Sequence, residues 1–161
     1  MVRVREMAAD EWELMRDIRL DALREAPYAF ASSYAREAAY DEEQWRGWFA
    51  RRFVIYLGYH GASLDTEPAG LAGVFVSGGA ADLVSMWVRP AARGQGVGEA
   101  LVEASAAWAK THSFDALFLW VTESNARALA LYERCGFTPT GETQPLPSDP
   151  SLPEIQMRRK L

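Results

Sequence analysis

The stretch from Leu83 to Trp108 constrains the fold of this chain most, because it predicts a strand, a glycine loop and a helix in direct succession. Residues 83–88 are mostly β-branched or apolar, and Pro90 marks the strand's exit because it cannot donate to a sheet ladder. Glycines then stand at positions 94, 96 and 98, and apolar side chains recur with helical spacing at positions 97, 101, 104 and 108. Backbone N–H groups in such a loop can converge on an anion, and the helix points its positive end there, so we expect a phosphate or pyrophosphate.

The spacing of the glycines separates three kinds of phosphate loop. A nucleoside-triphosphate loop needs Gly-x-x-x-x-Gly-Lys-Ser/Thr, whereas Glu99 and Ala100 follow Gly98 here. In the dinucleotide fingerprint, Gly-x-Gly-x-x-Gly, the third glycine comes one residue later than in this chain, so a nicotinamide-binding oxidoreductase is kept only as an alternative. If the loop is considered alone, it can also be a glycine-rich turn that binds no ligand.

A second stretch, from Asn125 to Phe137, predicts a short helix with defined ends. Ser124 or Asn125 can cap its start, and Gly136 can supply a left-handed residue at its end. The side chains at positions 128, 131 and 135 fall on one face, with Tyr132 beside it.

Together the two stretches resemble the GNAT N-acetyltransferase superfamily. The segment Arg93-x-x-Gly96-x-Gly98 is similar to its acyl-CoA pyrophosphate loop, and residues 125–137 match its pattern Asn-x-x-Ala-x-x-Leu-Tyr-x-x-x-Gly-Phe throughout. The resemblance implies an α/β (α+β) fold: a mixed, mostly antiparallel sheet of about seven strands, splayed between the fourth and fifth and flanked by about four helices. It also implies that an amine attacks the thioester of acetyl-CoA directly and that no metal takes part.

Carried over residue by residue, the resemblance assigns cofactor contacts. Met86 and Val88 would bind the pantetheine arm through their backbone, and the N–H groups of residues 93–99 would hold the pyrophosphate. Tyr132 would lie near the sulfur and act as general acid, because a thiol pKa of roughly 8.5 lets a tyrosine of about 10 protonate the leaving thiolate. The full expected cofactor set is Met86, Trp87, Val88, Arg93, Gly94, Gln95, Gly96, Val97, Gly98, Glu99, Asn125 and Tyr132.

The general base is less defined by the sequence. An amine with a pKa of roughly 8 to 10 must lose a proton to a carboxylate or through water. Asp82, near the start of the central strand, and Glu123, just past the parallel one, are the expected catalytic carboxylates, with Glu25 and Glu37 as further candidates. For each of them a solvated surface carboxylate is the simpler interpretation. His60 and His112 stand in no metal-ligand or triad pattern, and Cys135 is expected to be a packed side chain.

The remaining elements follow from periodicity and turn residues. Asp10 is placed to cap a first helix that ends at Pro27, an irregular aromatic connection follows to Tyr34, and Asp41 can cap a second helix. Residues 144–153 contain four prolines and are expected to form an ordered excursion or a mobile lid, not a strand. The expected strands span residues 2–5, 53–59, 70–76, 81–88, 114–121, 137–143 and 154–160.

Composition fits one domain spanning residues 1–161. A hydrophobic content of 49% supports a real core, and no apolar run is long enough to span a membrane. The first residues lack an apolar signal region and Cys135 is the single cysteine, so a cytoplasmic location is expected. A net charge of −5 argues against nucleic acid as a partner and favours a cationic substrate.

By elimination, the acceptor site is expected on the side that the cofactor leaves free, built from the two amino-terminal helices, their aromatic connection and residues 144–153. Tyr28, Phe30 and Tyr34 could offer aromatic faces to an ammonium group, and Glu37 could add negative potential. The acceptor is then an amine on a small molecule, a peptide or a protein, and a homodimer stays open. A non-catalytic module that binds acyl-CoA as a sensor or scaffold is the alternative function.

Overall fold

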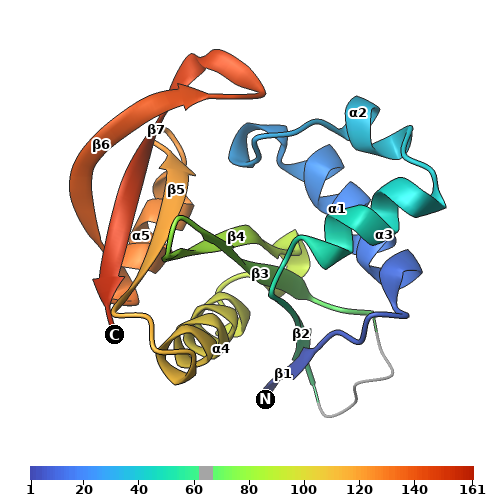
Figure 1. Cartoon of the computed structure of the whole chain (residues 1–161), viewed down its shortest axis with the longest axis horizontal. Helices are drawn as coiled ribbons and strands as arrows, with labels where there is room; N and C mark the ends of the chain where they lie inside the picture. The colour runs from blue at the N-terminus through green and yellow to red at the C-terminus, as the bar shows by residue number, and fades with distance from the viewer. Residues whose placement is uncertain (62–66) are drawn as a thin grey trace.

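The computed structural model describes residues 1–61 and 67–161. Its centre is a seven-stranded sheet in the order β1-β2-β3-β4-β5-β7-β6 (Figure 1). The strands are β1 (Val2–Glu6), β2 (Val54–His60), β3 (Gly70–Ser77), β4 (Ala80–Val88), β5 (Ala116–Thr122), β6 (Thr138–Leu146) and β7 (Asp149–Lys160). Among the strands of the described residues, β4 and β5 are the only parallel neighbours, and the other pairs are antiparallel. The predicted mixed, mostly antiparallel sheet is confirmed.

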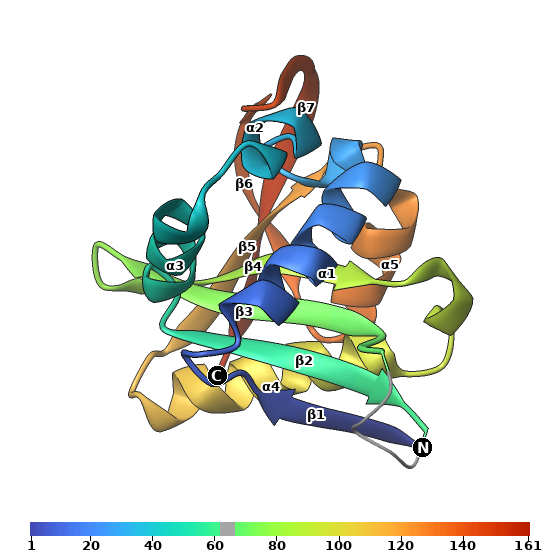
Figure 2. The ribbon, with the colours of Figure 1, turned by 90° about the vertical axis from the view of Figure 1, so that its right-hand side faces the viewer.

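Helices cover both faces of this sheet, as Figures 1 and 2 show. The helices are α1 (Trp12–Glu25), α2 (Tyr34–Ala38), α3 (Glu42–Ala50), α4 (Val97–Thr111) and α5 (Ala126–Arg134), with the 3-10 turns η1 (Pro27–Ala29) and η2 (Pro90–Ala92). One hydrophobic core lies between α4 and the sheet, where Leu101 is fully buried. A second core lies on the opposite face, where Met15 of α1 and Trp45 of α3 are buried. We call the α1–α3 side the front face.

The parallel strands separate soon after they meet. Register partners are limited to Ala81 with Leu117 and Asp82 with Phe118, although both strands continue for several residues. The expected splay between the fourth and fifth strands is therefore present.

The segment 144–153 was predicted not to be a strand, and this prediction is wrong. β6 continues to Leu146 and β7 begins at Asp149, so the segment is the end of a long hairpin. Pro145 and Pro153 face each other in it. Pro145 is tolerated because β6 is an edge strand, where a missing backbone N–H removes no ladder bond on the open side. Pro150 and Pro153 lie in β7 before the stretch, residues 154–160, that pairs with β5, so one side of that strand is open there.

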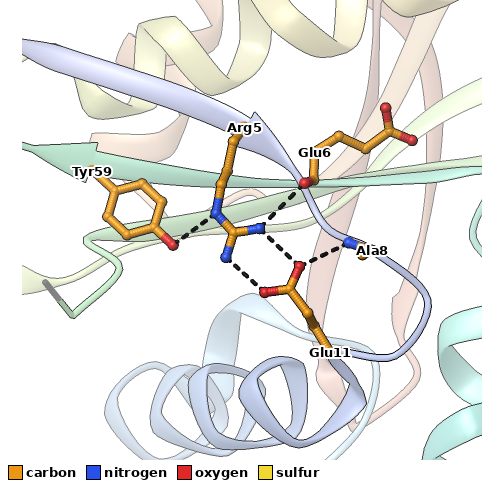
Figure 3. A network of polar contacts seen from close by, with 5 residues as sticks. All are labelled: Arg5, Glu6, Ala8, Glu11 and Tyr59. Atoms are coloured by element: carbon orange, nitrogen blue, oxygen red, sulfur yellow. Dashed lines mark hydrogen bonds and ion pairs between the residues drawn. The ribbon is translucent and has the colours of Figure 1, made fainter. Parts of the chain in front are cut away.

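The cap of the first helix also differs from the prediction. Glu11, not Asp10, occupies the N-cap position of α1, and it makes no side-chain cap bond there. Its carboxylate instead accepts the N–H of Ala8 at 2.8 Å and two bonds from the Arg5 guanidinium at 2.7 and 2.8 Å (Figure 3). These bonds, led by that from Arg5, hold the pKa of Glu11 below its usual range.

The same guanidinium ties the start of α1 to the sheet. The Nε of Arg5 donates to the hydroxyl of Tyr59 in β2 at 3.2 Å, and a further N–H donates to the carbonyl of Glu6. Glu11 is thereby linked to β1 and β2 together. This network fixes the start of α1 relative to β1 and β2. The end of α1 forms part of the wall of the cavity described next.

Candidate functional site

A cavity of about 510 Å³ opens where β4 and β5 separate. Its walls come from the end of α1 and η1, the second half of β4, the glycine loop and α5. Nine of the twelve residues expected to contact the cofactor line it: Met86, Trp87, Val88, Arg93, Gly94, Gly98, Glu99, Asn125 and Tyr132. Gln95, Gly96 and Val97 are not among the lining residues, and Val97 is buried in the core under α4.

A β-bulge shapes the inner end of this cavity. Leu71 pairs with Trp87 and Gly73 with Val84, so the intervening Ser85 and Met86 face a single residue of β3. Ser85 has a φ of +59°, a left-handed conformation that a serine adopts at a cost. The bulge leaves Ser85 and Met86 without register partners in β3 and disrupts the regular ladder there. Nothing in the sequence signals it, since no glycine marks the position.

The glycine loop forms the outer end of the cavity. Gly94 and Gly96 have φ values of +78° and +88°, and no atom lies within 4 Å of a Cβ built on Gly94. The 15-residue helix α4 starts directly after Gly96 without any side-chain cap. Its first N–H groups are therefore available to an anion at the positive end of the helix. The loop thus fits a phosphate group.

Gly98 serves a different purpose. A Cβ at this position would lie 3.0 Å from Cδ2 of Leu131, so the absent side chain lets α4 pack closely against α5. This contact holds the two signature segments together at the cavity.

Arg93 is held in place by protein groups. Its Nε donates to the carbonyl of Val88 at 2.9 Å, and its Nη2 donates to Glu25 of α1 at 2.7 Å. The indole N–H of Trp87 donates to the same carboxylate at 2.8 Å. Burial alone would raise the pKa of Glu25, but the bonds from Trp87 and Arg93 keep it below its usual value. Glu25 thus joins α1 to β4 and the glycine loop.

Tyr132 is 6% exposed and lines the cavity. Its ring packs edge-on against Phe137, with the centroids 5.8 Å apart. Burial raises the pKa of the phenol, so the hydroxyl stays protonated at neutral pH. Within the described part of the chain this hydroxyl has no hydrogen-bond partner, which leaves it available to a ligand. Asn125, as predicted, caps α5 by accepting the N–H of Ala128 at 3.3 Å.

The two candidate base residues lie apart. Asp82 projects to the front face, because its neighbours Ala81 and Leu83 belong to the core under α4. It is half-buried, and burial raises the pKa of its carboxyl group. Glu123 is exposed just after β5, where its backbone N–H donates to the carbonyl of Pro153.

The structure places one of the four expected acceptor-site residues in the cavity wall. Tyr28 lines it, and its carbonyl accepts a bond from Thr122 Oγ1 at 2.6 Å. Phe30 is buried beneath the Arg19 guanidinium, and the hydroxyl of the exposed Tyr34 accepts a bond from Arg24. Glu37 is 1% exposed and both its oxygens accept bonds from Arg19, so its carboxylate is already neutralised.

Sequence reasoning missed one buried carboxylate on the front face. Glu154 of β7 pairs with Thr122, the residue that holds Tyr28. It is 6% exposed and accepts a bond from Gln144, and burial raises the pKa of its carboxyl group. Its burial depends on the pairing of β7 with β5, which residues close to it in the sequence do not signal.

The described residues contain neither a membrane-spanning helix nor a cluster of metal-binding side chains. None of the helices there is long and apolar enough to cross a membrane. No group of three or more His, Cys, Asp and Glu side chains suited to a metal ion was found within residues 1–61 and 67–161.

Comparison with known proteins places these features in context. The model of the "Acetyltransferase (GNAT) family" matches residues 12–137. A mycothiol acetyltransferase of Salinispora tropica is 38% identical over 84 residues, which cover 50% of this chain and 24% of that protein. A GCN5-related N-acetyltransferase from Kribbella flavida superposes with a TM-score of 0.71 at 25% identity, covering 99% of this chain and 98% of that one. A GNAT acetyltransferase from Streptococcus pneumoniae gives 0.78 at 16% identity, covering 100% and 99%.

The curated relatives are much longer proteins. The matched segments span 24% of the Salinispora mycothiol acetyltransferase and 32% of the one from Thermobispora bispora. The likeness to them covers 50% and 60% of this chain, respectively.

Proposed function

The chain belongs to the acetyltransferase (GNAT) family, and from this premise we propose that it is an N-acetyltransferase that moves an acetyl group from acetyl-CoA to a primary amine. One observation carries the proposal. A single cavity joins an uncapped helix N-terminus, suited to a pyrophosphate, to a buried and protonated tyrosine beside the strand split.

The proposed binding mode follows the cavity from end to end. The pyrophosphate lies against the N–H groups of residues 94–99, where α4 begins. Arg127, which also lines the cavity, adds positive charge beside the loop. The pantetheine arm runs along the second half of β4 and reaches the bulge at Ser85 and Met86.

The proposed reaction is direct transfer. The amine nitrogen attacks the thioester carbonyl carbon, an N–C bond forms, and the C–S bond breaks. Backbone N–H groups released by the bulge stabilise the negative charge that develops on the carbonyl oxygen. Tyr132 gives its proton to the leaving thiolate, and the proton of the amine passes to a base.

Of the two expected bases, the surroundings favour Asp82. Its pKa is raised by burial, which brings it closer to that of the amine, whereas Glu123 is exposed. Asp82 stands three residues before the bulge, which is roughly 10 Å along a strand. The proton therefore travels through water.

The function is tested by following free thiol from acetyl-CoA with a panel of primary amines. We expect amine-dependent release of CoA and an acetylated amine detected by mass spectrometry. A protein that is stabilised by CoA but releases no thiol with any amine would instead be a non-catalytic acyl-CoA-binding module. A protein indifferent to CoA would contradict both functions.

Asp82→Asn is expected to lower kcat/KM for the amine by about 10- to 100-fold at neutral pH, because it removes the proton acceptor. The same change should stabilise the fold at neutral pH. The folded carboxyl has a raised pKa, so its contribution to stability is complete below the unfolded pKa of about 3.9 and is lost as pH rises through the folded pKa. Asparagine carries no such penalty.

Glu123→Gln is the matched control, since it removes an exposed carboxylate near the other end of the split. Rates and melting temperatures of both variants are compared with the parent protein from pH 5 to pH 9. Equal losses of activity in the two variants, or a loss only in Glu123→Gln, would remove Asp82 from the mechanism.

A further inference from the structure

Two arginines share one buried tryptophan on the front face. The Arg52 guanidinium carbon lies 3.5 Å from the centroid of the Trp48 ring, and that of Arg19 lies 5.2 Å from it. Trp48 is 3% exposed. Arg19 is neutralised by Glu37, which accepts two bonds at 2.9 and 3.1 Å. The cluster of Arg19, Glu37, Trp48 and Arg52 thus contains two cations and one carboxylate.

Within the part of the chain that the structure describes, Arg52 is the cation of this cluster that makes no ion pair. Among the described residues no carboxylate lies within ion-pair distance of it, and its buried Nε has no hydrogen-bond partner. One weak bond remains, from its Nη1 to the carbonyl of Trp48 at 3.3 Å. Burial, followed by repulsion from Arg19, lowers the pKa of Arg52 to about 9. A partly buried and unpaired guanidinium lowers the stability of the fold, so we expect it to have a function.

The position of Arg52 on the front face, close to the bulge, indicates what this function could be. Its Cγ lies 3.4 Å from a Cβ built on Gly73, and Cγ2 of Val84 lies 3.7 Å from the same point. Val84 directly precedes Ser85, the start of the bulge. The arginine stem therefore lies over the sheet on the front face, roughly 7 Å along the strand from Met86, by the rise of two residues. An acceptor that reached the bulge from the front face would pass this side chain.

We propose that the acceptor amine carries a carboxylate, which the guanidinium of Arg52 binds. The inference rests on the proposed acetyl transfer, since it places the acceptor at the same bulge. A surplus of one positive charge matches a monoanion, and a guanidinium pairs with a carboxylate through two parallel hydrogen bonds. The acceptor is then zwitterionic, not the purely cationic amine that the net charge of the chain suggests. The stem of Arg52 lies about 7 Å along the strand from Met86 of the bulge, and a carboxylate and an amine that far apart favour an ω-amino acid over an α-amino acid.

The test compares amines that differ in one group. 4-Aminobutyrate and 6-aminohexanoate are measured against butylamine and hexylamine, and O-phosphoethanolamine against ethanolamine. In the parent protein, kcat/KM should be at least about 10-fold higher for each carboxylate-bearing amine than for its parent amine. Arg52→Met should reduce this ratio to near one and leave the KM for acetyl-CoA within about twofold.

Two further variants distinguish binding of a carboxylate by the guanidinium of Arg52 from a general effect of positive charge or of protein folding. Arg52→Lys keeps the charge without the planar fork and should retain an intermediate ratio. Arg46→Met removes an exposed cation from α3 and should leave the ratio unchanged. If Arg52→Met does not fold, the lysine variant alone carries the test, and an unchanged ratio in it would count against the proposal.

Several outcomes would overturn the proposal while the acetyl transfer stands. These are equal rates with carboxylate-bearing and plain amines, a ratio that persists without Arg52, or a preference for the phosphate-bearing amine. If no amine releases CoA, the proposed function fails separately. Stabilisation by 6-aminohexanoate in the presence of CoA is then compared between the parent protein and Arg52→Met. Equal melting shifts in the two proteins would show that Arg52 binds no carboxylate.

Discussion

Tyr132→Phe is expected to lower kcat by about 10- to 1,000-fold at neutral pH while the affinity for CoA stays nearly unchanged. The change removes only the hydroxyl, so the edge-on packing against Phe137 remains. Without that hydroxyl the thiolate must leave unprotonated or take its proton from water. Steady-state release of CoA measures the chemistry, and the melting shift caused by CoA measures binding.

The raised pKa of Tyr132 adds a second expectation. Because burial keeps the phenol protonated well above its ordinary pKa of about 10, ionisation of this group should cause no loss of activity in the accessible basic range. Tyr56→Phe is the control, as Tyr56 is a half-buried tyrosine of β2 that does not line the cavity. Full activity in Tyr132→Phe would show that water supplies the proton and that the hydroxyl has a structural role.

The local parts of the candidate site were predictable from the sequence. The loop between β4 and α4 depends on positive φ angles that few residues other than glycine adopt at low cost, so Gly94 and Gly96 indicate it in the sequence. The ends of α5 depend on Asn125 as a cap and on Gly136, whose φ is +88°. Each of these features rests on residues close together in the chain.

Features that depend on distant partners were not predictable. Glu37 and Arg19 are 18 positions apart, and nothing local shows that the carboxylate is buried in an ion pair. The bulge at Ser85 depends on the register of β4 against β3. The long β6–β7 hairpin was not predicted because prolines usually end strands, whereas they are acceptable on the edge strand β6 and on the part of β7 that precedes its pairing with β5. The acceptor side consists mainly of such distant contacts, and therefore its chemistry became visible only in the structure.

Gly96→Asp is expected to abolish the stabilisation of the fold by CoA. A ligand at 100 times its Kd stabilises a protein by about 2.7 kcal/mol, and this shift should be present in the parent protein and absent in the variant. The aspartate would place a carboxylate at the N-cap of α4, where the pyrophosphate is expected, and like charges would repel. Melting curves with and without millimolar CoA measure the effect.

Two controls separate charge from backbone strain in this experiment. Gly96 has a φ of +88°, so any side chain there also strains the loop. Gly96→Asn introduces a side chain of the same size that tolerates this conformation and bears no charge, so it should keep part of the CoA shift.

Gly141→Asp introduces the same charge at a φ of +95° in β6, where no atom lies within 4 Å of the added Cβ. It should lower the ligand-free melting temperature and keep the full shift. If Gly96→Asp responds to CoA as Gly141→Asp does, the pyrophosphate does not bind at the glycine loop, because a carboxylate at the helix start could not leave its affinity intact.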